Sequence, residues 1–124
     1  MEPKVIVGRK LNEDGWRFPG GFVDPSDLSL ECAARREVTE EVGNIEISDI
    51  TYLNSLRMDK DCRYRKSNHK IMTALFKAKY IFGIIQANDD LAEVRWQHRD
   101  GLIQCLVDEH KSLGELYLKS INNK

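Results

Sequence analysis

The stretch from Pro19 to Gly43 reads PGGFVDPSDLSLECAARREVTEEVG, and it decides which fold the chain adopts. It begins with a proline and two glycines and continues into a helix-like segment that carries three glutamates within five residues, Glu37, Glu40 and Glu41. With 100° between successive helical residues, the three carboxylates fit within roughly 100° of the helix surface. Like charges at this spacing repel each other, so holding them together needs an explanation.

The residues alone leave two interpretations of this acidic helix open. One is a solvated charged face, which surface helices commonly present, since repulsion one turn apart costs only ~0.2–0.5 kcal/mol. The other is a site for a divalent cation such as Mg²⁺, which binds carboxylate oxygens and keeps several waters. Arg36 lies next to Glu40, where it can orient and partly neutralise the acids. Beside the acids, Ala34, Val38 and Val42 form an apolar stripe, which we expect to pack on a sheet.

The residues that flank the acids resemble the motif of the Nudix hydrolase family, G-x5-E-x7-R-E-U-x-E-E-x-G-U, where U is aliphatic. Gly21 matches the opening glycine, and residues 36–43 match the core of the motif. The resemblance implies Mg²⁺ or Mn²⁺ as the cofactor and a reaction that hydrolyses a nucleoside diphosphate linked to another group. It implies these metal ligands: the carbonyl oxygen of Gly20 and the carboxylates of Glu37, Glu40 and Glu41.

The general base stays open between the helix glutamates and an acid from a later loop. Glu93 is the candidate for that later acid, because in related enzymes an acid just before the tryptophan-containing strand reaches the metals. An exposed carboxylate at a strand end is the alternative for Glu93, and Asp89 and Asp90 are expected to be turn residues. The catalytic residues implied in this way are Arg36, Glu40, Glu41 and Glu93.

The chain departs from the family motif at two positions. The first motif glutamate is absent, and Asp27 is followed by eight residues before Arg36, where the motif has seven. Asp27 and Glu31 are both candidates for its role, which in the family is mainly structural support for the arginine. Asn44 replaces the final aliphatic residue. Neither departure changes the metal-binding glutamates, so we expect activity to survive.

Outside the motif, the chain resembles the Nudix domains fused to nicotinamide mononucleotide adenylyltransferases, which act on ADP-ribose. The similar stretches are 16–25, 63–65 and 70–73. The resemblance implies cleavage of ADP-ribose to AMP and ribose 5-phosphate, with another nucleotide sugar, a dinucleoside polyphosphate or a nucleoside triphosphate as the alternative. In the basic loop, arginines can clamp phosphate and a tyrosine can stack on a base, although a solvated hairpin tip fits equally. The expected substrate-binding residues are Arg17, Arg63, Tyr64 and Arg65.

Composition limits the partners of the chain. Its 124 residues suit one domain, residues 1–124. The formal net charge of -1 argues against nucleic acid or an acidic membrane surface as the main partner. The resemblance to the Nudix hydrolases implies a small nucleotide as the partner. No apolar run approaches the ~18 residues of a membrane span. Three cysteines without a C-x-x-C pair favour a reducing, cytoplasmic setting.

The order of expected elements predicts an α+β fold, a mixed sheet with a helix on each side, and the resemblance implies the Nudix α/β/α sandwich. Only residues 1–3 precede the first expected strand, so we expect the family's usual first strand to be missing and a homodimer to cover the exposed edge. A non-catalytic nucleotide sensor is the alternative class of function, although such domains usually lose a motif glutamate. Strands are expected at 4–9, 16–18, 45–47, 50–57, 71–80 and 93–97, and helices at 29–42 and 108–121.

Overall fold

Four strands and three helices are found in residues 4–57 and 71–122, which the computed structural model describes. In these residues, no helix is both long enough and apolar enough to cross a membrane. The elements follow the order β1 (Lys4–Lys10), α1 (Leu30–Val42), β2 (Glu46–Arg57), β3 (Met72–Phe82), β4 (Leu91–His98), α2 (Leu102–Cys105) and α3 (Asp108–Asn122).

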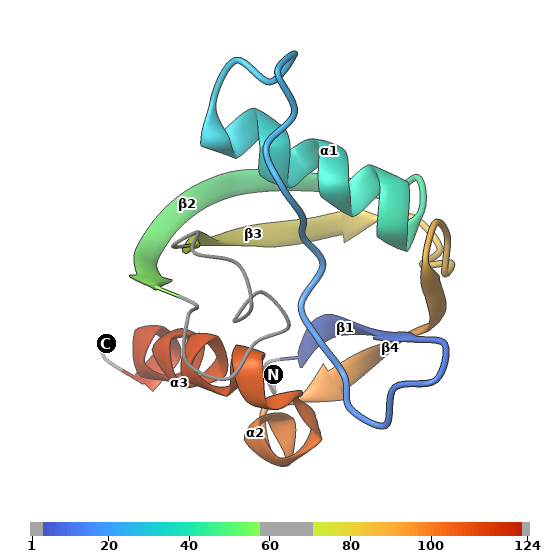
Figure 1. The fold of residues 1–124 in the computed structure, drawn as a ribbon, viewed down its shortest axis with the longest axis vertical. Helices are drawn as coiled ribbons and strands as arrows, with labels where there is room; N and C mark the ends of the chain where they lie inside the picture. The colour runs from blue at the N-terminus through green and yellow to red at the C-terminus, as the bar shows by residue number, and fades with distance from the viewer. Residues whose placement is uncertain (1–3, 58–70, 123–124) are drawn as a thin grey trace.

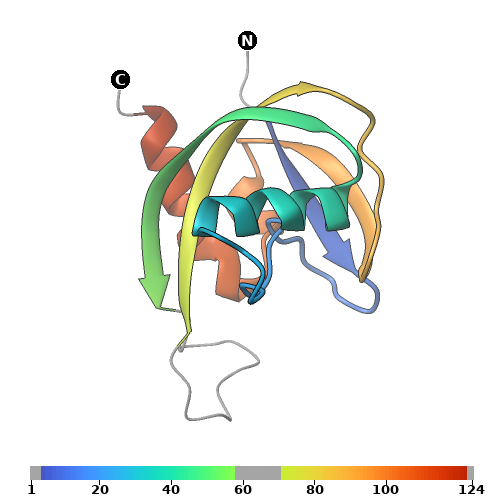
Figure 2. The ribbon, with the colours of Figure 1, turned by 90° about the horizontal axis from the view of Figure 1, so that it is seen from above.

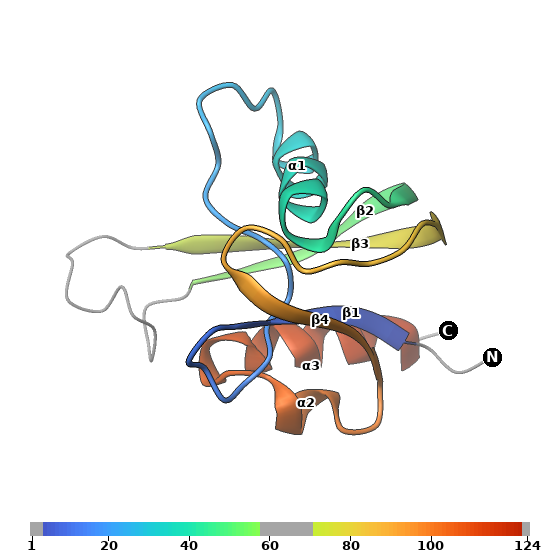
Figure 3. The ribbon, with the colours of Figure 1, turned by 90° about the vertical axis from the view of Figure 1, so that its right-hand side faces the viewer.

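The strands form two antiparallel pairs, β1 with β4 and β2 with β3, which lie between the helices. Figure 3 shows α1 outside the β2–β3 pair and α2 and α3 outside the β1–β4 pair. Seen from above, the beginning of α1 lies across β3, and β2 curves around the helix (Figure 2). This arrangement confirms the predicted α+β sandwich. The parallel component of the predicted mixed sheet is limited, in the described residues, to one bridge between Trp16 and Leu106.

Two strand predictions were wrong in extent. Residues 16–18 form two isolated bridges, Arg17 with Gly8 and Trp16 with Leu106, and not a strand. Pro19 follows at once and has no N–H with which to extend a ladder. The segments predicted at 45–47 and 50–57 form the single strand β2. Asp49, with a φ of 54°, lies where the register with β3 shifts, so a bulge and not a turn divides them.

Helix α1 forms where the sequence predicts it. The Ser29 hydroxyl accepts the N–H of Cys32 at 3.0 Å, which caps the first turn. Gly43 follows the helix with a φ of 108°, a conformation that favours glycine, and a Cβ there would lie 3.3 Å from the backbone nitrogen of Gln86. The first turn carries the acidic Glu31, and the last turn carries no basic residue. Local signals therefore fix both ends of this helix.

The buried face of α1 differs from the predicted apolar stripe. Ala34 and Val38 are half-buried, and of the predicted stripe only Val42 is buried. The other buried residues of α1 are Ala33 and two of the motif acids, Glu37 and Glu41. The prediction placed the acids beside the buried face. In the structure Glu37 and Glu41 are part of it, because residues 19–21 cover this side of the helix with backbone and leave room for carboxylates.

A small apolar cluster lies on the other side of the molecule. Val7 of β1 packs with Leu102 and Leu106, and Trp16 and Phe18 pack against this cluster. Helix α2 was not predicted, since four residues are too few to show helical periodicity. The predicted helix at 108–121 is present as α3. The segment that precedes the two glycines is therefore held between β1 and the end of α2.

Candidate active site

The connection between β1 and α1, residues 11–29, carries Pro-Gly-Gly across the molecule to the acidic helix (Figure 1). The Gly20 N–H donates to Oε1 of Glu41 at 2.9 Å. A Cβ on Gly21 would lie 2.2 Å from Oε2 of Glu37, so a larger residue here would displace this carboxylate from its position. The glycines therefore contact the two buried carboxylates directly. The predicted role of the Gly20 carbonyl oxygen as a metal ligand stays a prediction.

The loop after β3 brings two further acids to this place. Its backbone is fastened to the end of α1, because the N–H of Gln86 donates to the Val42 carbonyl at 2.7 Å and that of Asn88 to the Glu41 carbonyl at 3.0 Å. One carboxylate oxygen each from Glu41, Asp89 and Asp90 lies within 4.8 Å of the other two. The three acids form a group that we call the carboxylate cluster.

Asp89 and Asp90 do lie in a turn, as predicted, with a φ of 57° at Asp89. Sequence reasoning did not assign them to the site, because the Asn-Asp-Asp pattern indicates only the turn. Their position beside Glu41 depends on hydrogen bonds between segments that are far apart in the sequence. Lys10 partly neutralises the cluster, with its Nζ 3.2 Å from Oδ2 of Asp90.

Glu93, the predicted later acid, lies on β4 opposite Arg9 of β1 and forms an ion pair with it. Its side chain is 54% exposed, and it is not a member of the carboxylate cluster. This placement agrees with the alternative interpretation of an exposed strand-end carboxylate. A catalytic role for Glu93 stays a prediction, and the structure offers Asp89 and Asp90 as acids nearer to the motif helix.

Arg36 organises the remaining acids of the helix. Its Nη1 donates to Oε1 of Glu40 at 3.1 Å and lies 3.6 Å from Oε2 of Glu37. The Glu37 side chain is 11% exposed and that of Glu40 is 48% exposed, so the two carboxylates have different environments. Of the three predicted helix ligands, Glu41 alone belongs to the carboxylate cluster in the described residues. The metal-binding roles of Glu37 and Glu40 stay predictions.

Asp27 takes the supporting role that the sequence left open. Arg36 donates from Nε to Oδ1 of Asp27 at 3.0 Å and from Nη2 to Oδ2 at 2.8 Å, a bidentate pair. The Asp27 side chain is 5% exposed, and the hydrogen bonds from Arg36 hold its pKa below the ordinary value. Glu31, the other candidate, is exposed in the first turn of α1. The extra residue of the motif is therefore absorbed between Asp27 and the helix.

The electrostatics of the site favour a bound cation. The pKa of Glu41 is raised to about 7, mainly by burial. The hydrogen bond from the Gly20 N–H lowers this pKa, and the neighbouring acids contribute to raising it. Burial also raises the pKa of Glu37. Carboxylate oxygens are the ligands that Mg²⁺ and Mn²⁺ prefer, and a cation reverses the repulsion between them. The residues present therefore fit a divalent metal.

A cavity of about 1040 Å³ adjoins the acids. Gly20, Gly21, Glu37 and Glu41 line it together with aromatic side chains, among them Phe18, Phe76, Tyr80 and Tyr117. A cavity of this size with apolar and charged lining residues suits a small organic ligand. A ligand in this cavity would lie next to the two buried acids of α1.

The structure gives Arg17 a different environment from that of a free phosphate-binding side chain. Arg17 lines the cavity but is only 8% exposed, and its guanidinium donates to Glu13 and Glu109. Its predicted substrate contact stays a prediction. The other predicted substrate-binding residues, Arg63, Tyr64 and Arg65, lie outside the described residues.

The fold and the Gly-Gly loop on an acidic helix define the chain as a Nudix domain. The NUDIX domain family matches residues 2–117, and the chain therefore belongs to this family. A solved structure of the NUDIX domain of Shewanella oneidensis NrtR complexed with ADP ribose is similar to it, with a TM-score of 0.78 and 22% identity over 97% of this chain and 79% of that one. A Caenorhabditis elegans Ap4A hydrolase complex has a TM-score of 0.72 and 19% identity, over 98% and 88% of the two chains.

A relative with higher identity covers a smaller region. An RNA pyrophosphohydrolase of Pseudomonas putida is 41% identical over 54 residues, which are 44% of this chain and 33% of that protein. The corresponding protein of Pseudomonas fluorescens gives the same values. The match thus spans one third of the length of these relatives. A UDP-X diphosphatase structure is similar in fold, with a TM-score of 0.75 and 23% identity over 96% of this chain and 57% of that one.

Proposed function

We propose that the chain is a Nudix pyrophosphohydrolase that uses Mg²⁺ or Mn²⁺ to hydrolyse a nucleoside diphosphate linked to another moiety. The observation that carries the proposal is the carboxylate cluster of Glu41, Asp89 and Asp90 at the end of α1, next to the cavity. A diphosphate is itself negatively charged, so acids in this position can receive it only through cations.

The protein side of this reaction is mainly positioning. When bound, the metal would supply screening of the phosphate charges and a water of lowered pKa. The Gly20 N–H holds one oxygen of Glu41, and Arg36 holds Glu40 while Asp27 holds Arg36. These contacts fix the acids before substrate arrives, which is where such enzymes gain much of their rate. The general base stays open between the helix glutamates, Glu37, Glu40 and Glu41, and a later acid, for which Glu93 is the candidate.

ADP-ribose, cleaved to AMP and ribose 5-phosphate, is the proposed substrate. Aromatic side chains on the cavity walls can stack on a nucleobase. The resemblance in residues 16–25 and the ADP ribose in the similar NrtR domain support this choice. The alternatives are another nucleotide sugar, a dinucleoside polyphosphate or a nucleoside triphosphate, for which the UDP-X diphosphatase and Ap4A hydrolase structures are precedents.

A second candidate function is removal of phosphate from an RNA end. The 41% identity to RNA pyrophosphohydrolases over 54 residues favours it. The formal net charge of -1 argues against it, because RNA binding rests largely on positive charge that contacts phosphates. A non-catalytic nucleotide sensor is a third possibility of a different class.

The test is a substrate panel with purified protein and Mg²⁺. It should contain ADP-ribose, UDP-sugars, dinucleoside polyphosphates, nucleoside triphosphates and a 5′-triphosphate RNA, each assayed for the products of phosphate-chain cleavage. We expect the highest kcat/KM for ADP-ribose. A higher kcat/KM for the RNA would favour the second candidate function. Tight nucleotide binding without turnover would overturn the proposal that the chain is an enzyme.

Matched variants of α1 should accompany the panel. Glu41→Gln removes a charge from the carboxylate cluster, and we expect kcat to fall at least ~100-fold, since metal stabilisation amounts to several kcal/mol. Glu31→Gln makes the same change at an exposed position of the same helix and should leave kcat unchanged. Equal activity of the two variants would contradict the assignment of the metal site.

A further inference from the structure

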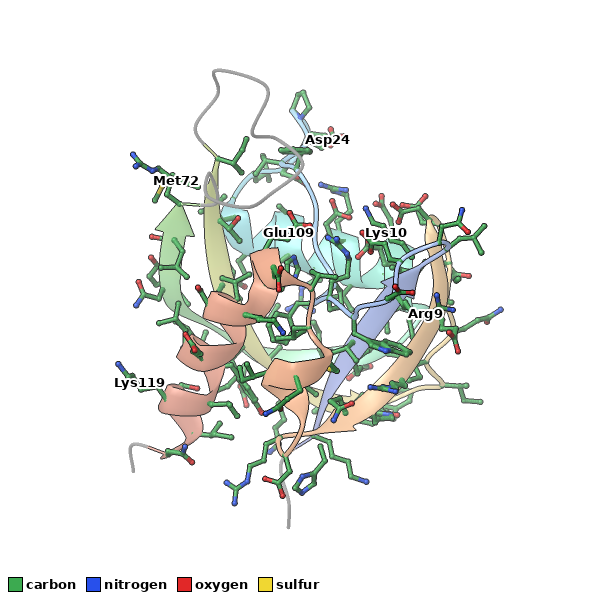
Figure 4. All side chains as sticks on the ribbon, turned by 60° about the horizontal axis from the view of Figure 1, so that its bottom comes forward. Arg9, Lys10, Asp24, Met72, Glu109 and Lys119 are labelled. Atoms are coloured by element: carbon green, nitrogen blue, oxygen red, sulfur yellow. The ribbon has the colours of Figure 1, made fainter. Side chains whose placement is uncertain are left out.

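The first turn of α3 contacts the chain just before the two glycines. Nη2 of Arg17 donates to Oε1 of Glu109 at 2.8 Å. The backbone N–H of Phe18 donates to Nδ1 of His110 at 3.0 Å. In the view of Figure 4 Glu109 lies near the middle, whereas Lys119 of the same helix lies toward the edge. Adjacent residues of α3 thus hold adjacent residues of the segment that leads to the site.

The Arg17 contact is a partly buried ion pair with two acids. Arg17 donates from Nε and Nη2 to the two oxygens of Glu13, at 3.1 and 3.0 Å, as well as to Glu109. The Arg17 and Glu109 side chains are 9% and 14% exposed. A planar guanidinium that is shared in this way fixes both the position and the orientation of the residue that carries it. Arg17 is therefore built to hold its own segment in place.

The His110 contact lies at the point where backbone pairing of the segment ends. Arg17 exchanges two backbone hydrogen bonds with Gly8, each of 2.8 Å. Pro19 has no N–H, and the next backbone donor, Gly20, bonds to Glu41. In the described residues, Phe18 therefore carries the one backbone N–H between the strand-like part and the site, and His110 accepts it. The rings of Phe18 and His110 also stack, with centroids 5.9 Å apart.

We propose that Glu109 and His110 are positioning residues that fix the glycine segment against α1 and so hold the Gly20 N–H on Glu41. Neither side chain belongs to the carboxylate cluster. Their effect passes through Arg17 and Phe18 along a backbone path of two to three residues. The catalytic consequence rests on the proposed function, whereas the positioning itself is a property of the metal-free protein.

Amide hydrogen exchange in the metal-free protein, measured by NMR, tests the positioning directly. Glu109→Ala removes the partner of Arg17, and His110→Phe keeps a ring that can stack on Phe18 but has no acceptor. In each variant we expect the protection of the Gly20 amide to fall about tenfold, the size of one lost hydrogen bond. Glu115→Gln, at an exposed position of α3, is the control and should leave this protection unchanged.

Conservative variants separate positioning from general stability. Glu109→Gln keeps an oxygen that can accept from Arg17, so it should restore most of the protection that Glu109→Ala loses. Arg17→Lys keeps the charge but not the planar fork, and should resemble Glu109→Ala. It also provides the test if Glu109→Ala does not fold. A loss of protection that is spread evenly over α1 and β1, or none at Gly20, would overturn the proposal.

Kinetics give the second measurement. If the proposed function holds, Glu109→Ala and His110→Phe should each lower kcat about tenfold, because Glu41 loses its fixed orientation. Both side chains also line the cavity, so KM does not separate positioning from substrate contact, and kcat is compared with the exchange of the Gly20 amide. If the wild-type protein turns over no member of the panel, the proposed function fails. The exchange of the Gly20 amide still decides the positioning in that case, since it needs neither metal nor substrate.

Discussion

Replacement of Glu41 with glutamine should stabilise the metal-free protein at high pH while it removes activity. Glu41 is 7% exposed, and burial is the main reason that its pKa is raised to about 7 from an ordinary value of 4.5. Glutamine has nearly the same shape, keeps an oxygen that can accept the Gly20 N–H, and carries no charge. The substitution therefore isolates the free energy of burying this carboxylate.

The sign follows from the direction of the pKa. Because the folded-state pKa lies above the unfolded one, proton binding favours the folded protein, and this contribution is present below pH 4.5 and lost as the pH rises through 7. The separation between the two pKa values corresponds to about 3 kcal/mol. Water in the adjoining cavity screens part of the charge, so we expect Glu41→Gln to be about 1–2 kcal/mol more stable at pH 8.

The assay is urea denaturation of chelator-treated wild type and Glu41→Gln from pH 4.5 to 8.5. The difference in unfolding free energy should grow with pH, and Glu31→Gln should show no such trend. Addition of Mg²⁺ should stabilise the wild type and not Glu41→Gln, which would reverse their order. A glutamine variant that is no more stable than wild type at pH 8, or a difference that does not depend on pH, would refute the reasoning.

Three further predictions concern the loop, the glycines and the assembly. Asp27→Ala should lower kcat about tenfold by freeing Arg36, whereas Glu31→Ala should not, and steady-state kinetics compares them. Gly21→Ala should weaken Mn²⁺ binding measured by electron paramagnetic resonance, because its Cβ would displace the Glu37 carboxylate, whereas Gly20→Ala has no neighbour within 4 Å and should fold normally. Light scattering at micromolar concentration should give the mass of a homodimer, and a monomer would contradict that prediction.

Local features of the sequence were sufficient to predict α1 and α3, but not the four-residue α2. Ser29 and Gly43 act within one turn of α1, and the spacing of apolar residues in α3 needs no distant partner. The strand predicted at 16–18 shows the limit of this approach. Its residue types favour a strand, but Pro19 and the packing between β1 and α2 leave room only for isolated bridges.

The candidate site was predicted as far as the motif extends. The pairing of Arg36 with Asp27, and not with Glu31, depends on how the loop at 22–29 turns, which spacing alone leaves open. The sequence predicts the turn at Asp89 but not its proximity to Glu41. That proximity depends on hydrogen bonds between the loop after β3 and the end of α1, which are more than 40 residues apart. The engagement of Arg17 by Glu109 likewise joins two ends of the chain. Such contacts follow from the assembled fold.

The last turn of α1 carries no basic residue, and this has a consequence for how the domain is kept folded. The carbonyl end of a helix bears about half a negative charge, and isolated helices normally place cations there. Here the same end carries Glu41 and receives Asp89 and Asp90, so partial and full negative charges accumulate together. A divalent ion bound in this position would neutralise the helix dipole as well as the side chains. The stability of the domain should therefore follow the free concentration of divalent metal in its surroundings.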